Sequence, residues 1–205
     1  MSEYDLHSLI LACDFCVDDV DRMWKWLKKH HDELESIGAH HVVLYESIWE
    51  PNRVLVTIGI RHVQSIREVF LRSPAIFEWF NIAGAVDIPP IFGGEVVEKI
   101  DLYAPTAIDR VGRVVVGVMS SVEDVSALMA KVHDGLDRFK QGGVRKIWVY
   151  RALDDGQEVM ILQEIEDEVA ARNWIDHPPT RRPSGCRTPG WAPTPPPSSS
   201  GVSPT

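Results

Sequence analysis

This chain has few of the features that mark secreted, membrane-spanning or nucleic-acid-binding proteins. Its 205 residues include only three cysteines, too few for a disulfide scaffold. No apolar run reaches the ~18–20 residues that a membrane-spanning helix needs, and the start of the chain lacks a basic region followed by an apolar one. Basic residues number 21 against 30 acidic ones, a formal charge of −9, which argues against nucleic-acid or anionic-membrane partners. We expect a soluble, cytoplasmic protein.

Familiar catalytic and metal-binding motifs are also missing. The sequence has no glycine loop with phosphate-binding spacing and no serine-centred nucleophile elbow. Cys13 and Cys16 have the spacing of a zinc or redox pair, but no second pair accompanies them. His30-His31 and His40-His41 are adjacent pairs, whose side chains diverge on a regular helix or strand. We therefore expect no metal site and no cofactor.

The composition changes near the end of the chain. Residues 179–205 are rich in proline and serine and include the run Pro195-Pro196-Pro197-Ser198. Such a segment buries too little apolar surface to offset the entropy lost on ordering. We predict that residues 179–205 form a disordered tail.

The rest of the sequence repeats at an interval of 105 residues, without a gap from Leu9 to Ile60. Gly38 aligns with Gly143, and Tyr45 aligns with Tyr150. Each half begins with an apolar strand, followed by an acidic helix start, an amphipathic helix and a glycine stop. A hairpin comes next, and a second helix then begins near Val63 in the first half and Asp167 in the second.

This order of elements predicts an α+β fold of two tandem ferredoxin-like β-α-β-β-α-β units, at residues 7–104 and 112–178. Two such units would pack face to face as an intramolecular α/β barrel. The first unit has a closing strand at Val96–Leu102, whereas the second unit lacks its last strand, since the tail begins there. The chain would be a monomeric pseudo-dimer, or a homodimer formed through the unpaired edge.

A shifted reading frame is one explanation for the missing strand. When the third base of each codon from Pro179 onward is joined to the next two bases, suitable codons encode D-A-A-A-E-W-M-S-N-A-G-L-G-A-Y-P-P-P-F-V-V-G-R-F-A-Y. The first unit, after Ser73-Pro74, reads A-I-F-E-W-F-N-I-A-G-A-V-D-I-P-P-I-F-G-G-E-V. Glu-Trp, Ala-Gly, Pro-Pro and Phe recur in the same order and spacing. The other explanation is a natural disordered extension.

Each half resembles a domain of the dimeric α/β-barrel proteins of the antibiotic-biosynthesis-monooxygenase-like group. The residues that carry the resemblance are Asp21-Arg-Met-Trp24-Lys25, His31, Gly38-Ala39, Tyr45, and the stretch from Ser73-Pro74 through Ala83-Gly84 to Pro89-Pro90. The resemblance covers residues 9–102 and 113–178. It implies a ferredoxin-like fold in a group that includes cofactor-free monooxygenases, haem-degrading enzymes, polyketide cyclases and many proteins of unassigned function.

Strand alternation predicts which side chains face the barrel interior. Val42, Leu44, Ile147 and Val149 share an aliphatic face that should meet the helices. The opposite face carries a mixed polar and apolar set, which we take as the candidate ligand-binding residues: His41, Tyr45, Lys146, Trp148 and Tyr150. Such a mixture is typical of small-molecule pockets, although large core residues with satisfied polar tips would give the same pattern.

The sequence therefore predicts a small-molecule-binding protein of the monooxygenase-like α/β-barrel group, with a hydrophobic or aromatic ligand. A cofactor-free oxygenase or cyclase is one form of this hypothesis, but no motif indicates a catalytic residue. The alternative is a non-catalytic interaction or regulatory module. A third hypothesis is a haem-binding protein, for which Trp174 and His177, three positions apart on a helix, are the candidate residues.

Overall fold

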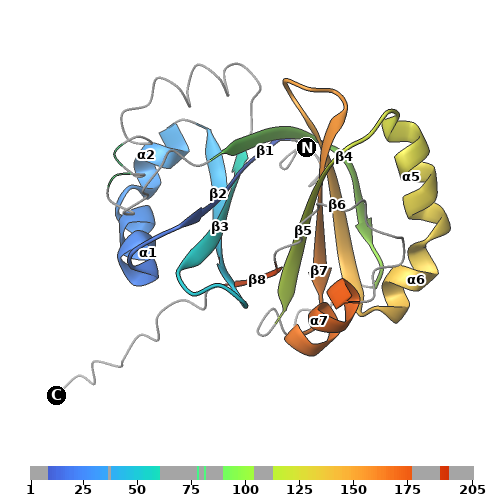
Figure 1. Cartoon of the computed structure of the whole chain (residues 1–205). Coiled ribbons are helices and arrows are strands. Elements are labelled where there is room, and N and C mark those ends of the chain that lie inside the picture. The colour runs from blue at the N-terminus through green and yellow to red at the C-terminus, as the bar shows by residue number, and fades with distance from the viewer. Residues whose placement is uncertain are drawn as a thin grey trace.

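A computed structural model describes residues 9–36, 38–60, 78, 81, 90–103, 113–176 and 190–193. The helices and strands, labelled as in Figure 1, are β1 (Leu9–Cys16), α1 (Val20–Lys29), α2 (His31–Ser36), β2 (Ala39–Ser47), β3 (Arg53–Ile60), β4 (Ile91–Asp101), β5 (Val114–Ser121), α5 (Val125–Asp134), α6 (Leu136–Gln141), β6 (Val144–Ala152), β7 (Glu158–Ile165), α7 (Glu168–Asp176) and β8 (Gly190–Pro193).

The strands form one antiparallel sheet that closes into a barrel, with the helices on its outside (Figure 1). Around the barrel the strand order is β1-β3-β2-β8-β5-β7-β6-β4. Because the barrel is closed, the strands of the first half lie in the order β4-β1-β3-β2 and those of the second half in the order β8-β5-β7-β6. Each is the strand order of a ferredoxin-like unit. The predicted α+β class and ferredoxin-like arrangement are confirmed.

The register of the two halves agrees with the interval found in the sequence. Leu9 pairs with Ile60 in the first half, and Val114 pairs with Ile165 in the second, 105 residues further along. The descent of both halves from one repeated unit stays a prediction.

Strand β4 joins the two halves. Its first part, Ile91–Glu95, pairs with β1 of its own half. The longer part, Gly94–Asp101, pairs with β6 of the other half. This one strand therefore forms backbone hydrogen bonds with both halves of the barrel.

Strand β8 corrects the prediction that the second unit lacks its last strand. Gly190–Pro193 lie within the segment that the sequence analysis assigned to a disordered tail, yet they pair with both β5 and β2. The two neighbouring strands offer backbone partners on both sides, which stabilises even a short segment. The remainder of residues 177–205 lies outside the described residues.

The position of β8 differs from that of β4 in one respect. β4 pairs Gly94 with β1, and β8 pairs Trp191 with the corresponding residue of β5. Trp191 follows Gly94 by 97 residues, whereas the other equivalent strands are 105 residues apart. The strand position is thus filled eight residues early. Pro193, the last residue of β8, has no backbone N–H to donate to the ladder.

Aspartate caps begin helices α1 and α5, and left-handed glycines precede strands β2 and β6. The side chain of Asp19 accepts a hydrogen bond from the Arg22 backbone N–H, which caps the helix start. Asp124 caps α5 in the same manner. Gly38 and Gly143 have φ values of 90° and 78°, a left-handed conformation that favours glycine, just before β2 and β6.

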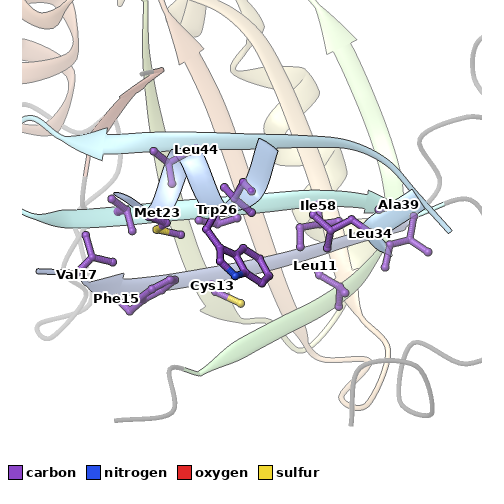
Figure 2. Close-up of a cluster of buried hydrophobic side chains, with 14 of the residues drawn as sticks. Leu11, Cys13, Phe15, Val17, Met23, Trp26, Leu34, Ala39, Leu44 and Ile58 are labelled. Carbon is purple, nitrogen blue, oxygen red and sulfur yellow. The ribbon is translucent and has the colours of Figure 1, made fainter. Parts of the chain in front are cut away.

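Buried side chains form three clusters, two under the helices and one inside the barrel. In the first half Met23, Trp26 and Leu34 pack on the outer face of β1, β2 and β3 (Figure 2). The equivalent cluster of the second half surrounds Ile147 and Val149. The prediction that Val42, Leu44, Ile147 and Val149 meet the helices is confirmed.

One prediction falls on a part of the chain that the structure leaves undescribed. The predicted start of the second helix of the first half, near Val63, lies outside the described residues. No helix in the described ranges is long and apolar enough to cross a membrane.

The two cysteines of β1 differ sharply in their surroundings. Cys13 is buried, and burial raises the pKa of its thiol to about 12. Cys16 is exposed at the end of the strand. Being three positions apart on a strand, they point to opposite faces and do not form a dithiol site.

Alkylation with iodoacetamide should therefore separate the two thiols. At pH 8 a thiol with a pKa near 12 is deprotonated in only about one molecule in ten thousand, so Cys16 is expected to react and Cys13 to stay unmodified. Peptide mass spectrometry after a timed reaction gives the extent at each site. Unfolding in urea should make the two rates equal; fast reaction of Cys13 in the native protein would contradict its burial.

A one-base insertion within codons 178–179 tests the shifted-frame explanation. The new frame would replace Gly190–Pro193 and would place the apolar segment F-V-V-G-R-F-A-Y after a retained proline run, in place of residues 198–205. This segment is long enough to form a strand. Burying even one or two such side chains should raise the free energy of unfolding by about 2 kcal/mol or more. Urea denaturation compares this variant with the given chain and with one that ends after Asp176.

Re-sequencing the gene across these codons provides the direct check. An unbroken frame at this position, together with no gain in stability for the insertion variant, would leave the natural extension as the explanation.

Candidate functional site

Three of the five predicted site residues come together inside the barrel. Tyr45, Trp148 and Tyr150 belong to one interior cluster, packed with Phe92 and Leu162. Tyr150 is buried, and loss of solvation, with a smaller contribution from Tyr45, raises the pKa of its phenol above the usual range. The phenol of Tyr150 therefore stays protonated at neutral pH. Neither of the two cavities described below is lined by these residues.

Lys146 has a structural role near the end of β6. Its ammonium group pairs with Asp101 of β4 at 2.9 Å. It also lies 5.5 Å from the centre of the Trp148 ring, a cation–π distance. The ion pair joins β6 to β4, whereas the cation–π contact lies within β6, so the charge of Lys146 helps to hold two strands together.

His41 is exposed near the start of β2 and does not belong to this interior cluster. A bulge in β2 lies directly before it. The pairing with β3 runs from Ala39–Ile60 directly to His41–Gly59, which leaves His40 as an extra residue. The rings of His40 and His41 meet edge to face with their centres 4.6 Å apart. A Cβ on Gly59 would overlap both rings. The expectation that adjacent histidines on this strand diverge is therefore wrong.

A cavity of about 370 Å³ lies between helices α1 and α2 and strand β2. Its apolar lining comes from Leu27, Leu34, Ala39 and Val42. Its polar and aromatic lining comes from Trp24, Lys28, His31, Glu35, His40 and His41. His41 is thus the one predicted site residue that lines this cavity.

Helical spacing explains why α1 and α2 present these side chains together. Trp24, Lys28, His31 and Glu35 follow one another at intervals of three or four residues, so they share one side of the helical segment. The helical spacing of these residues can be seen in the sequence. The bulge in β2, which brings His40 and His41 to the same cavity, cannot.

Trp24 contributes a buried hydrogen-bond donor that is not used. Its Nε1–H is shielded from solvent and has no acceptor within hydrogen-bond distance in the part of the chain that the structure describes. The ammonium group of Lys28 lies 5.2 Å from the centre of the Trp24 ring. Trp24 and Lys28 therefore contact each other in the lining of the cavity.

At the equivalent place of the second half, β4 and the residues after it contact the helices and β6. Glu98, near the end of β4, pairs with His133, the counterpart of Lys28, at 3.0 Å. Tyr103, just beyond β4, donates a hydrogen bond to the carbonyl oxygen of Lys140 and packs on Arg145.

A second cavity, of about 510 Å³, lies between α6 and α7 and is more open. Trp174 lines it, donates its indole N–H to Gln163 at 2.7 Å and packs against Phe139. Trp174 is therefore engaged in joining α7 to the sheet. His177, its predicted partner in a haem site, lies outside the described residues, so the residues in view do not make up that site.

Helix α2 carries a cluster of one histidine and two carboxylates. His31, Asp32 and Glu35 bring their ligand atoms within 4.8 Å of one another, but all three side chains are exposed. His31 and Asp32 are adjacent, with their charged atoms 3.5 Å apart. Exposed groups of this kind pair with each other and with water, so the cluster is not by itself a metal site.

Compared by sequence, the chain matches no family model and no curated protein. Compared by structure, it is similar to an anthrone oxidase-like protein, with a TM-score of 0.58 and 13% identity over 95% of this chain and 94% of that one. It is also similar to a candidate monooxygenase from Fusobacterium nucleatum, with a TM-score of 0.59 and 8% identity over 91% and 92% of the two chains.

A third similar structure is that of a major regulator of staphylococcal pathogenesis, with a TM-score of 0.52 and 12% identity over 91% of this chain and 99% of that one. At such identities a likeness establishes the fold and leaves the chemistry open. The chain therefore has the ferredoxin-like fold of the antibiotic-biosynthesis-monooxygenase-like proteins.

Proposed function

We propose that this chain is a small-molecule-binding protein whose ligand lies in the cavity between α1, α2 and β2. The observation that carries the proposal is the cavity itself, with an apolar lining and a few polar groups that converge from two elements. Its volume, about 370 Å³, and its mixture of surfaces are typical of small-ligand sites. The ligand would be a hydrophobic or aromatic molecule.

The same site has groups that can move protons. His31, His40 and His41 line the cavity, and imidazole is the side chain whose ordinary pKa lies nearest to neutral. An oxygenase or cyclase reaction would require a base within hydrogen-bond reach of the ligand, and these three residues are the candidates for that role. Tyr45, Trp148 and Tyr150 lie elsewhere, inside the barrel.

One observation favours the alternative of a non-catalytic module. The barrel interior is occupied by packed side chains, including Phe92, Met160 and Leu162, as expected of a scaffold. The two hypotheses differ in whether the cavity on the helix side is occupied in the cell.

Native mass spectrometry of the protein purified from its own host, at neutral pH, tests the proposal. We expect a retained small molecule in the given chain. The variant Val42→Phe, which places a ring in the cavity, should lose it, whereas Val169→Phe, at the other cavity, should retain it. Circular dichroism confirms that both variants fold. A bare mass for every protein, or a ligand that survives Val42→Phe, would contradict this site.

A further inference from the structure

Helix α2 presents three metal-ligating side chains at close range. His31 and Glu35 are four positions apart, so one helical turn places both side chains on the same side of α2. Asp32 directly follows His31. One ligand atom from each of the three residues lies within 4.8 Å of the other two. One imidazole and two carboxylates make up a donor set that Zn²⁺ accepts.

The separations within this cluster approach those that a bound zinc ion requires. Bonds from zinc to nitrogen or oxygen are about 2.0–2.2 Å long, so neighbouring ligand atoms of a tetrahedral site lie about 3.4 Å apart. The Nδ1 atom of His31 and the Oδ1 atom of Asp32 are already 3.5 Å apart. The other separations do not exceed 4.8 Å, so a movement of about 1.4 Å in the exposed Glu35 side chain closes them.

The cluster borders a cavity that contains two further imidazoles. His31 and Glu35 line this cavity from α2, and His40 and His41 line it from β2. The connection between the two elements is short, because the backbone N–H of Gly38 donates to the carbonyl oxygen of Glu35 at 2.9 Å and β2 begins one residue later. An ion held by α2 therefore lies at a cavity that also offers imidazole nitrogens from a second element.

The charge of α2 favours a cation. The helix carries three carboxylates in its six residues and no lysine or arginine. Among the described residues, Asp32 pairs with His31 alone, and Glu35 pairs with no lysine or arginine. Lys28, which lines the same cavity, has its ammonium group over the Trp24 ring, 5.2 Å from the ring centre. The two carboxylates of the cluster are thus left to attract a cation from solvent.

The neighbouring histidine has a different role, which makes His31 the ligand of this adjacent pair. The Nδ1–H of His30 donates a hydrogen bond to the carbonyl oxygen of Trp26 at 3.0 Å. The His30 ring also stacks on the Trp26 ring, with the ring centres 4.2 Å apart. His31 is exposed and lines the cavity. The metal site therefore uses one histidine of the pair together with residues one and four positions later.

We propose that His31, Asp32 and Glu35 form a binding site for a divalent transition-metal ion, with Zn²⁺ as the best match, in the lining of this cavity. The coordination position that faces the cavity is left for water or for an imidazole of His40 or His41. This proposal goes beyond the proposed function, because the ion needs only these side chains and no organic ligand.

Calorimetric titration with zinc chloride tests the site, using the full chain without an affinity tag after treatment with a chelator and removal of that chelator. We expect a single ion to bind per chain. Mg²⁺ and Ca²⁺ should bind about tenfold or more weakly than Zn²⁺, because these cations prefer sites made of oxygen atoms alone. Zinc binding no tighter than Mg²⁺ binding would overturn the proposal, since carboxylates alone would then account for it.

Variants separate the ligands from the general charge of the surface. His31→Asn and Glu35→Gln should each weaken zinc binding by about tenfold or more, since even residues that only support a ligand change metal affinity by about 10–100-fold. Glu33→Gln is the matched control, because it makes the same charge change on α2 outside the cluster and should have a much smaller effect. His133→Asn removes an exposed imidazole that pairs with the single carboxylate of Glu98, and should leave zinc binding unchanged.

Circular dichroism and thermal melting confirm that each variant is folded, as expected of changes to exposed side chains. Equal losses of zinc affinity in Glu33→Gln and Glu35→Gln would overturn the assigned ligands, because net charge alone would then hold the ion.

An NMR readout identifies the ligand nitrogen independently of affinity. In protein labelled with ¹⁵N-histidine, the ring signals of His31, assigned by their loss in His31→Asn, should shift on addition of zinc, and those of His133 should not. Shifts that leave the His31 signals unmoved would overturn the site. A retained organic molecule without zinc binding would overturn this proposal alone, whereas zinc binding by a chain that retains no organic molecule would overturn the proposed function alone.

Discussion

The pairing of β4 with two sheets is the constraint on which the rest of this structure depends. A ferredoxin-like sheet has two free edges, and each edge presents unpaired backbone groups. By running from β1 onto β6, β4 closes one junction between the halves and places Glu98, Asp101 and Tyr103 against the second half. The barrel, its interior cluster and the difference between the two helix-covered faces all follow from that one long strand.

The contrast between β4 and β8 distinguishes the two helix-covered faces. The described strands of the two halves follow the same order, yet β4 runs for eleven residues and β8 for four. In the second half, Glu98 and Asp101 of β4 pair with His133 of α5 and Lys146 of β6. In the first half, the residues equivalent to this histidine and this lysine, Lys28 and His41, line the cavity between α1, α2 and β2.

The sequence predicted the parts of this fold that depend on periodicity. Alternation along Val42–Leu44 and Ile147–Val149 correctly identified the helix-facing side, because side chains of a regular strand alternate strictly. The same rule failed at His40, since a bulge adds this residue and breaks the alternation just before His41. Nothing in the local sequence marks that bulge; the register of the neighbouring strand decides it.

The sequence could not predict β8 or the cavity for a similar reason. A proline-rich segment has little strand propensity of its own, and only the two backbone edges beside it select Gly190–Pro193. Trp24 and Lys28 read as an ordinary helical stripe. Only the structure shows that they line a cavity together with residues of β2, more than ten positions away in the sequence.

The unequal lengths of the two junctions also make the barrel mechanically asymmetric. One junction is formed by Gly94–Asp101 of β4 against β6, while the other is formed by the four residues of β8, three of which pair with β2. Local opening follows the path with the fewest hydrogen bonds to break. Local opening of the barrel is therefore expected where β8 lies between β2 and β5, next to Tyr45, while the pairing of β4 with β6 stays intact and acts as the hinge.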